Sequence, residues 1–528
     1  MTFYFSPVFE NKLINEINSL KNGVSCGEDN ITSEIVKYNH RYLIGPLLHI
    51  INRVLCTGVY PDILKKAIVV PIYKQGDKKL TTNYRPIALI STISKLIEKC
   101  IKMKVSLFLQ KFDLLSSNQF AFRENSSTEN ALCRVSERIL NSLDEGKKVI
   151  GMFIDLTKAF DTVAHEILLE RLDNIGIRGI ANDLFKSYLS DRIQCVKVGD
   201  SFSNSLPVGF GVPQGTVLGP FLFSVYINEI FSVSGKDEVF CFADDTAIIV
   251  EGESWDVVIG KAERAITCIK TWMNNSLLSL NVNKTKFITF GLVHKNLPDV
   301  QGLRIHHPDC GITNEENCNC KCDNTIKREH SLKYLGILID ENLNWKGHIN
   351  YVTTKIRKLI YKFYELRHIL CKKTLKIVYL SLVESILNYG IVVWGGACKT
   401  LLSPLHVAQK YIMKIMLFKN RRYPSEALFR ESQILTINQL HIKSVLRFMM
   451  CCPYYKSGLL HNVNTRNAGR RNILVPSVRR SAAQRHICFI GPKLFNLLPV
   501  NLKNKPYKKV KNELNELIIG GNFSSPTY

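Results

Sequence analysis

Apolar residues recur every three or four positions over long stretches at the start of the chain, which is the spacing of helices with one buried face. Leu13, Ile17 and Leu20 show this spacing within residues 10–65, and it returns over Ile93–Gln110. The first part of the chain is therefore predicted to be mainly helical.

Short, continuous apolar runs predict β-strands between and after these helices. The candidate strands are Ala67–Tyr73, Lys147–Ile154, Val239–Phe242, Thr246–Val250, Lys286–Phe290 and Lys333–Asp340. The third and fourth of them flank a tight Ala-Asp-Asp sequence, which is typical of a hairpin. A charged loop, Lys74–Leu80, follows the first strand, and an apolar helix is expected to begin near Pro220. Helices that interleave with strands around a central hairpin indicate an α+β fold.

Beyond Asp340 the strands largely stop and a helical, strongly basic region follows. Its cations are Lys355, Arg357, Lys358, Lys362, Arg367, Lys372, Lys373 and Lys376. They form either a solvated helix face or a nucleic-acid contact. The whole chain carries 70 Lys and Arg against 45 acids, a net charge of +25. Because neutralised phosphates release counterions, this excess favours the nucleic-acid interpretation.

Composition limits the class of protein. The chain has 528 residues, more than one ordinary core holds, and 46% of them are hydrophobic. Met1–Glu10 lacks the features of a targeting signal, and Ile377–Ala397 is interrupted by Glu384 and Asn388, so we expect no membrane span. Several of the 16 cysteines lie among apolar residues, which predicts reduced core thiols in an intracellular compartment: Cys100, Cys133, Cys241 and Cys268.

Three carboxylates stand where strands are expected to end. Asp155 closes one apolar run, and Asp244 and Asp245 form the tip of the expected hairpin. Nucleotidyl transfer uses two divalent ions about 4 Å apart, and Mg²⁺ prefers hard oxygen ligands. An Asp-Asp pair in a turn is unremarkable by itself, but adjacent acids repel each other unless a cation compensates them. On these residues alone the sequence indicates metal-dependent phosphoryl transfer.

The same residues lie in segments that resemble the reverse transcriptases of non-LTR retrotransposons, particularly the jockey-like class. The matching segments are Ser25–Asp29, Asn83–Ile87, Gln119–Arg123 with Ser127–Thr128, Phe153–Asp161, Gly211–Pro220, Phe242–Asp245, Lys333–Gly336 with Asp340, Trp394–Gly395 and Asn496–Pro499. Ala121 departs from the family, which usually has glycine there. The resemblance covers nearly the whole chain and is most secure from about 54 to 340.

This resemblance implies a right-hand polymerase with fingers, a palm built on a central antiparallel sheet, and a helical thumb. The expected parts are a helical lead-in (1–53), fingers and palm (54–340), a basic thumb (341–420) and a mainly helical C-terminal extension (421–528). The implied activity is RNA-directed DNA synthesis with dNTPs on an RNA template, from a DNA primer or nicked target DNA. Mg²⁺ is the implied cofactor, with Mn²⁺ as an alternative, and the nucleus and cytoplasm are the implied locations.

The family's site residues can be placed on this sequence one by one. Asp155 and Asp244 become the principal metal ligands and Asp245 a supporting acid. Phe160 corresponds to a bulky gate that collides with a ribose 2′-OH and so favours dNTPs. Without the motif, Phe160 would be interpreted as a core aromatic. Asp161 is expected to cap the following helix.

The remaining implied roles concern the nucleotide. Arg85 is expected to clamp the triphosphate, because guanidinium binds phosphate bidentately, and Lys74 to assist, unless it is an ordinary exposed lysine. Gln214 and Gly215 would border the incoming base. Lys284, in preference to Lys286, is expected to protonate the departing pyrophosphate.

A cluster of zinc-like ligands lies outside these motifs. It consists of His306, His307, Cys310, Cys318, Cys320 and Cys322. Because Cys-x-Cys-x-Cys is not the usual zinc spacing, an exposed reduced loop is the default interpretation and a structural Zn²⁺ the alternative.

Two other functions stay open. An RNA-directed RNA polymerase would share the chemistry, but Phe160 argues against it, since such an enzyme has no reason to exclude the 2′-OH. A retroelement remnant that only binds nucleic acid would be expected to have lost a carboxylate, and all three are present. Jockey-like elements usually carry an endonuclease ahead of the polymerase, and we expect this chain to lack it.

Overall fold

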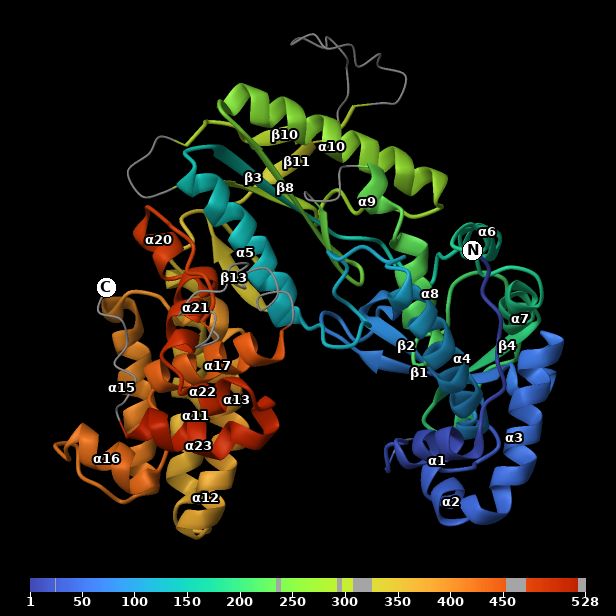
Figure 1. Cartoon of the computed structure of the whole chain (residues 1–528), viewed down its shortest axis with the longest axis horizontal. Helices are drawn as coiled ribbons and strands as arrows, with labels where there is room; N and C mark the ends of the chain where they lie inside the picture. The colour runs from blue at the N-terminus through green and yellow to red at the C-terminus, as the bar shows by residue number, and fades with distance from the viewer. Residues whose placement is uncertain (24, 234–238, 292–296, 307–324, 453–471, 521–528) are drawn as a thin grey trace. The chain divides into compact units, whose positions relative to one another are not determined.

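The computed structural model describes all residues except 24, 234–238, 292–296, 307–324, 453–471 and 521–528 (Figure 1). It divides into two compact units. Unit 1 comprises Met1–Phe122, Asp155–Thr246 and Ala265–Asn281, and unit 2 comprises Arg123–Ile154, Ala247–Arg264 and Val282–Tyr528. Within the described ranges, no helix has both the length and the apolar character needed to cross a membrane.

Unit 1 combines a small sheet with a set of helices. Its helices are α1 (Glu10–Asn18), α2 (Ser33–Tyr38), α3 (His40–Thr57), α4 (Thr92–Lys111), α6 (His165–Asn174), α7 (Ile180–Leu189), α8 (Leu218–Ile227) and α9 (Ile230–Val233). Its strands are β1 (Lys66–Tyr73), β2 (Tyr84–Leu89), β4 (Arg192–Val198), β5 (Ser201–Phe202), β6 (Leu206–Val208) and β7 (Val239–Phe242). The first five strands form a sheet in the order β2-β1-β4-β5, and β6 also pairs with β4.

The sequence patterns account for most of these elements. The helical prediction for residues 10–65 is confirmed by α1, α2 and α3, and that for Ile93–Gln110 by α4. The apolar helix predicted near Pro220 is α8, which begins two residues earlier and is buried along almost its whole length. The expected charged loop Lys74–Leu80 is exposed throughout.

Unit 2 contains the larger sheet and the C-terminal helices. Its strands are β3 (Lys148–Ile154), most of β8 (Asp245–Gly252), β9 (Lys286–Phe290), β10 (Gly302–Arg304), β11 (Thr325–Arg328), β12 (Ser331–Tyr334) and β13 (Ile337–Asp340). The sheet order is β10-β11-β9-β3-β8-β7, and β12 and β13 form a separate pair. Strands and helices thus mix as the α+β prediction requires.

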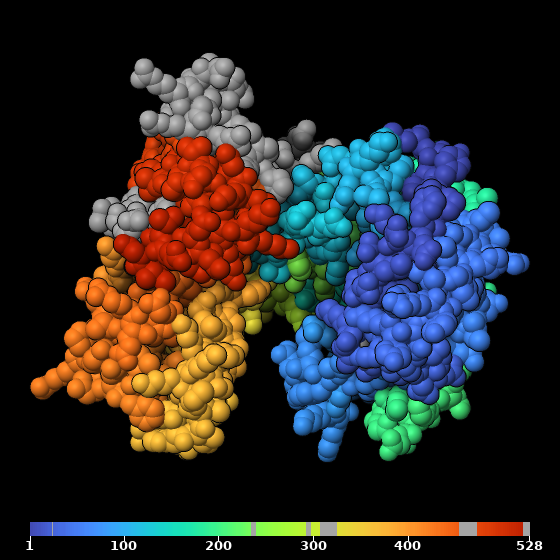
Figure 2. All heavy atoms as spheres, turned by 60° about the horizontal axis from the view of Figure 1, so that its bottom comes forward, coloured from blue at the N-terminus to red at the C-terminus, as the bar shows by residue number. Residues whose placement is uncertain are grey.

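Helices dominate the rest of unit 2 (Figure 1). They are α5 (Thr128–Asp144), the first half of α10 (Trp255–Asn275), α11 (Lys346–Leu366), α12 (Lys372–Tyr379), α13 (Ser385–Asn388), α14 (Ile391–Trp394), α15 (Lys399–Met416), α16 (Ser425–Ser432), α17 (Ile437–Cys451), α20 (Ser481–Gln484), α21 (Ile487–Asn496), α22 (Val500–Lys503) and α23 (Tyr507–Ile519). From about residue 340 onward they pack together as one body, yellow to red in Figure 2. The basic side chains Lys355, Arg357, Lys358 and Lys362 are exposed on α11.

Two sequence predictions about these elements are wrong. Lys333–Asp340 is not one strand but the hairpin of β12 and β13, turned by Leu335 and Gly336 with φ of 43° and 82°. Because glycine tolerates this left-handed backbone, the chain can turn at Gly336, in the middle of the apolar run that was expected to be one strand. Cys268, expected in the core, is exposed, whereas Cys100, Cys133 and Cys241 are buried as predicted.

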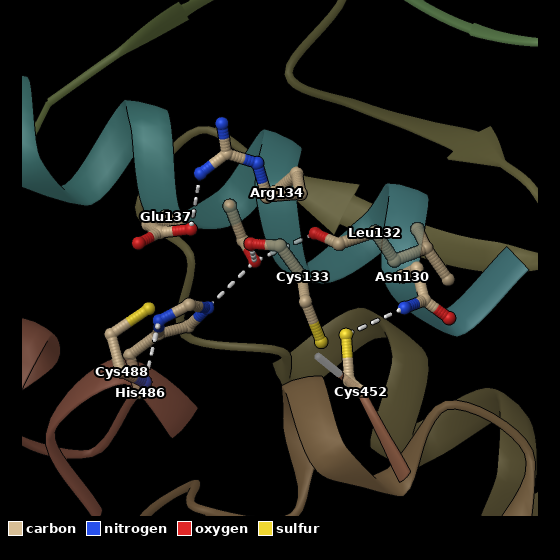
Figure 3. Close-up of polar contacts among 9 residues, drawn as sticks. Asn130, Leu132, Cys133, Arg134, Glu137, Cys452, His486 and Cys488 are labelled. Atoms are coloured by element: carbon tan, nitrogen blue, oxygen red, sulfur yellow. Dashed lines mark hydrogen bonds and ion pairs between the residues drawn. The ribbon is translucent and has the colours of Figure 1, made fainter. Parts of the chain in front are cut away.

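The C-terminal helices hold α5, as Figure 3 shows for several of the contacts. The Ser136 hydroxyl lies 2.8 Å from Nε2 of His486, and the Asn130 amide donates to Sγ of Cys452 at 3.1 Å. Nearby, the Asp144 carboxylate accepts from the backbone N–H of Arg479 and Arg480. Helix α5 is therefore completed by residues more than 300 positions away in sequence.

Candidate active site

Asp155 is held in a fixed loop directly after β3. Its carbonyl oxygen accepts from the Asn281 backbone N–H at 2.9 Å, and the Thr157 N–H donates to the Ser279 carbonyl at the same distance. A bridge between Leu156 and Leu280 lies between these bonds. The backbone on which the half-buried Asp155 side chain stands is therefore pinned to the segment after α10.

Asp244 and Asp245 lie at the turn between β7 and β8. Ala243, the first turn residue, has φ of 56°, the sign that a two-residue hairpin turn needs and an L residue rarely adopts. On the other side, the Cys241 N–H donates to the Asn118 carbonyl at 3.0 Å and the Phe120 N–H to the Cys241 carbonyl at 2.9 Å. The acidic turn is thereby fixed, with both aspartates exposed.

The three carboxylates act on one another electrostatically. Surrounding protein raises the pKa of Asp244, and the charge of Asp155 raises it further. Partial burial is also the largest cause of the raised pKa of Asp245, which is about 6, and the negative charges of Asp244 and Asp155 raise it further. Both side chains reach solvent, so we attribute the shift as much to crowding of like charge as to burial. Unit 1 therefore brings the three predicted ligands into one electrostatic cluster.

This cluster has the chemistry of a magnesium site. All its donors are hard carboxylate oxygens, and their mutual repulsion is relieved when a divalent cation binds. Over the described ranges, no three or more His, Cys, Asp or Glu side chains are already gathered closely enough to hold a metal. The residues fit the ion by donor type and charge, and Asp155, Asp244 and Asp245 are the ones that would hold it.

The raised pKa of Asp245 predicts how metal binding depends on pH. Below about pH 6 a proton competes with the metal for this carboxylate, so Mg²⁺ affinity is expected to fall by about tenfold per pH unit. Above about pH 7 the affinity should be flat. Calorimetric titration of Mg²⁺ between pH 5 and pH 8 measures this, with Asp245→Asn as the variant that loses the step. Equal affinities at pH 5 and pH 7 in the unmodified chain would contradict it.

Phe160 follows Asp155 closely in the sequence, and its ring contacts two other aromatic rings. Its ring stacks on that of Phe223 in α8, with centroids 4.5 Å apart, and meets the edge of Phe122 at 6.5 Å. Its carbonyl accepts from the Val212 N–H at 2.8 Å. The ring is half-buried, so it is neither a fully enclosed core residue nor a free surface group.

The Gln214 loop is fastened to two other elements. The Gln214 carbonyl accepts from the Ala88 N–H of β2 at 2.6 Å, and its side-chain amide donates to the Asp161 carboxylate at 2.9 Å. Gly215 has φ of +108°, and a Cβ there would lie 2.6 Å from the Ala88 carbonyl. Only glycine allows this approach.

Asp161 does not have its predicted role. We expected it to cap the next helix, but α6 begins at His165, and its capping position is Ala164. Asp161 instead accepts the Gln214 hydrogen bond. This hydrogen bond joins two motifs that are distant in sequence, and the sequence alone did not predict it. The sequence also did not predict the contact of Phe223 with Phe160, because Phe223 is one of many apolar residues in α8.

Arg85 lies in β2, and Lys74 directly follows the end of its partner strand β1. Ile72 is the partner of Arg85 across the ladder, and the Lys74 N–H donates to the Asn83 carbonyl at 2.9 Å. Both side chains are exposed, and both lower the pKa of Asp244. The two cations therefore lie on the same side of unit 1 as the acidic cluster.

The other predicted residues belong to unit 2. Lys284 is one of them, and its expected role in protonating pyrophosphate stays a prediction. In the cysteine cluster only His306 lies within the described residues, where its Nε2 is 3.6 Å from the Glu263 carboxylate. His307, Cys310, Cys318, Cys320 and Cys322 lie outside the described residues.

Comparison with known proteins gives three results. The sequence profile of the family described as "Reverse transcriptase (RNA-dependent DNA polymerase)" matches residues 72–339. Among curated proteins, the chain is 28% identical over 434 residues to "Probable RNA-directed DNA polymerase from transposon BS" of Drosophila melanogaster. It is 26% identical over 422 residues to "RNA-directed DNA polymerase from mobile element jockey" of the same species.

These alignments take 78% of the chain but 45% and 44% of the two relatives. The chain thus spans less than half the length of the curated relatives it matches. Among solved structures, telomerase from Candida albicans bound to a telomeric RNA fragment aligns at 12% identity, with a TM-score of 0.38, over 72% of this chain and 68% of that one. Apo telomerase from Candida tropicalis aligns at 14% identity, with a TM-score of 0.36, over 53% and 54%.

Proposed function

The chain belongs to the reverse transcriptase family, whose profile matches just over half of it, and we propose that it is an RNA-directed DNA polymerase of the non-LTR, jockey-like type. The observation that carries this proposal is the acidic cluster of Asp155, Asp244 and Asp245, flanked by Arg85 and Lys74 within one unit. A substrate that carries a triphosphate and a metal ion matches that distribution of charge.

The proposed reaction joins a primer to a nucleotide. The primer 3′ oxygen forms a bond to the α-phosphorus of a dNTP, the bond to the β-phosphate oxygen breaks, and pyrophosphate leaves. Asp155, Asp244 and Asp245 would hold Mg²⁺, which would supply the positive charge that this transfer needs. Arg85 from β2 and Lys74 from the end of β1 neutralise the triphosphate, and Gln214 borders the incoming base. Phe160, braced by Phe223, excludes a 2′-OH.

Primer extension by the purified chain with Mg²⁺ tests this proposal. On an RNA template, we expect dNTPs to be incorporated and rNTPs to be rejected. Preferential use of rNTPs would instead favour an RNA-directed RNA polymerase. RNA binding without any extension would favour a remnant that only binds nucleic acid.

We further propose that the RNA template, a DNA primer or nicked target DNA, and dNTPs are the partners of this site. The exposed basic face of α11 supports a nucleic-acid contact by its charge. We propose that the chain acts in the nucleus, where the element would integrate, and that it is also present in the cytoplasm.

Arg85→Ala is expected to raise the KM for dNTPs about 10- to 100-fold, because a charge-assisted bond to phosphate contributes about 1.5–3 kcal/mol. Arg85→Lys should recover part of this loss, since lysine keeps the charge but not the bidentate geometry. Steady-state primer extension measures both. Lys79→Ala, which removes an exposed cation of the nearby Lys74–Leu80 loop, is the control. Equal KM changes in Arg85→Ala and Lys79→Ala would show that only general charge matters.

A further inference from the structure

Glu98 is a fully buried carboxylate that the reaction described above does not use. It lies in α4 among the apolar residues Leu96, Ile97 and Ile101, and its exposed fraction is 0%. Burying a carboxylate is costly unless hydrogen bonds replace its hydration. The hydrogen bonds of Glu98 therefore indicate which part of the structure the buried carboxylate stabilises.

Both oxygens of Glu98 accept hydrogen bonds. Oε2 accepts from the backbone N–H of Val217 at 2.6 Å and of Leu218 at 3.0 Å. Oε1 accepts from the Tyr188 hydroxyl at 3.1 Å and the Ser94 hydroxyl at 3.4 Å. An ionised carboxylate only accepts, so four donors suit that form. Burial raises the pKa of Glu98, and the N–H groups and the nearby Arg192 oppose this.

The two N–H groups belong to the start of α8. Val217 occupies the capping position of this helix and offers no side-chain cap. Glu98 supplies from α4 the negative charge that a helix N-terminus attracts. The Thr216 hydroxyl completes the turn, since it accepts from the Gly219 N–H at 3.0 Å and donates to the Pro213 carbonyl at 2.8 Å.

This anchor lies between the two parts of the site that contact the nucleotide's base and sugar. Gln214 precedes Val217 by three residues, and Phe223, the stacking partner of Phe160, lies five residues after Leu218. A shift of the α8 start would move both. It would also change the cavity of about 270 Å³ that Gln214, Asp161, Ala88 and Arg192 help to line.

Resting on the proposed function, we propose that Glu98 is a positioning residue for the incoming dNTP. It fixes the start of α8 and thereby sets the Gln214 loop and the Phe160 ring against the nucleotide. The buried Arg192, whose Nη1 donates to the Tyr188 carbonyl at 3.1 Å, balances its charge.

Glu98→Gln is the primary test, because glutamine keeps the size but turns one acceptor into a donor. Primer extension should show a rise of about tenfold in the KM for dNTPs, with kcat within about threefold of the unmodified chain. A purely structural role would reduce the active fraction, which lowers apparent kcat and leaves KM unchanged. Glu16→Gln is the matched control: it removes an ion pair of 3.4 Å to Lys99 of the same helix and should leave KM within about twofold.

Tyr188→Phe keeps the inference testable if Glu98→Gln does not fold. It removes one donor to Glu98 and should raise the dNTP KM by about two- to fivefold. Unchanged KM in every folded variant, with only a lower kcat or melting temperature, would overturn the positioning role.

Hydrogen exchange separates this inference from the proposed function. With Mg²⁺ and a dNTP, amides of residues 213–219 should become protected in the unmodified chain and less so in Glu98→Gln and Tyr188→Phe. If the unmodified chain extends no primer, the proposed function is wrong. The role of Glu98 in positioning the nucleotide is then tested by the protection of residues 213–219 alone. Equal protection in all chains, or none in the unmodified one, would overturn it.

Discussion

Asp244→Asn is expected to abolish primer extension while RNA binding persists. Asparagine keeps the shape of the turn but removes one of the charges that would hold the metal. The positive charge at the reacting phosphate is then lost, and kcat should fall by about 10³-fold or more. The bonds that join Cys241 of β7 to Asn118 and Phe120 are made by backbone groups, so the hairpin should stay folded.

Single-turnover extension and fluorescence anisotropy with labelled RNA measure these two effects separately. Asp200→Asn, in the exposed turn between β4 and β5, is the control and should extend primers normally. Asp245→Asn should be impaired less than Asp244→Asn, since Asp245 is the proposed supporting acid. An Asp244→Asn chain as active as the unmodified one would refute the metal role.

Phe160→Val is expected to admit ribonucleotides. The half-buried ring is held in place by Phe223, at 4.5 Å between centroids, so it cannot easily swing away from a 2′-OH. A smaller side chain removes this collision, and the dNTP preference, as a ratio of kcat/KM values, should fall by about 10- to 200-fold. Most of the change should appear as faster use of rNTPs.

Competition between each dNTP and its rNTP on one template measures the ratio. Phe202→Val, at a side chain that is 55% exposed in β5, should keep the preference of the unmodified chain. If Phe160→Val lowers the use of both nucleotide classes equally, Phe160 is a packing residue and the gate assignment is wrong. Loss of packing against Phe223 is expected to lower the melting temperature in either case.

Local patterns in the sequence predicted those parts of the fold that depend on neighbours in the chain. Strands β3 and β9 and the acidic hairpin followed from apolar runs of strand length. The family, and with it the right-hand polymerase fold, followed from motifs such as Phe242–Asp245, and the profile match confirms it. The individual roles of Asp155, Asp244 and Asp245 stay predictions.

Contacts between distant segments were beyond such reasoning. Nothing near Asp161 indicates that it accepts from Gln214, 53 residues later, so capping the next helix seemed the simpler role. Glu98 looks like one polar residue in an apolar helix until its partners Val217 and Leu218 are known. Residues like Glu98 can be found from the sequence as single acids at positions that the helical pattern predicts to be buried.

The docking of α5 has a consequence for how the chain is made. Ser136 and its partner His486 are separated by 350 residues, so a ribosome working at 5–20 residues per second completes the pair roughly 20 to 70 s after Ser136 is synthesised. During that interval α5, whose end leads into β3, has an unfinished surface that chaperones can recognise. A stop codon between Asp245 and His486 would therefore leave α5 incompletely packed, although all three carboxylates proposed to hold the metal would still be encoded.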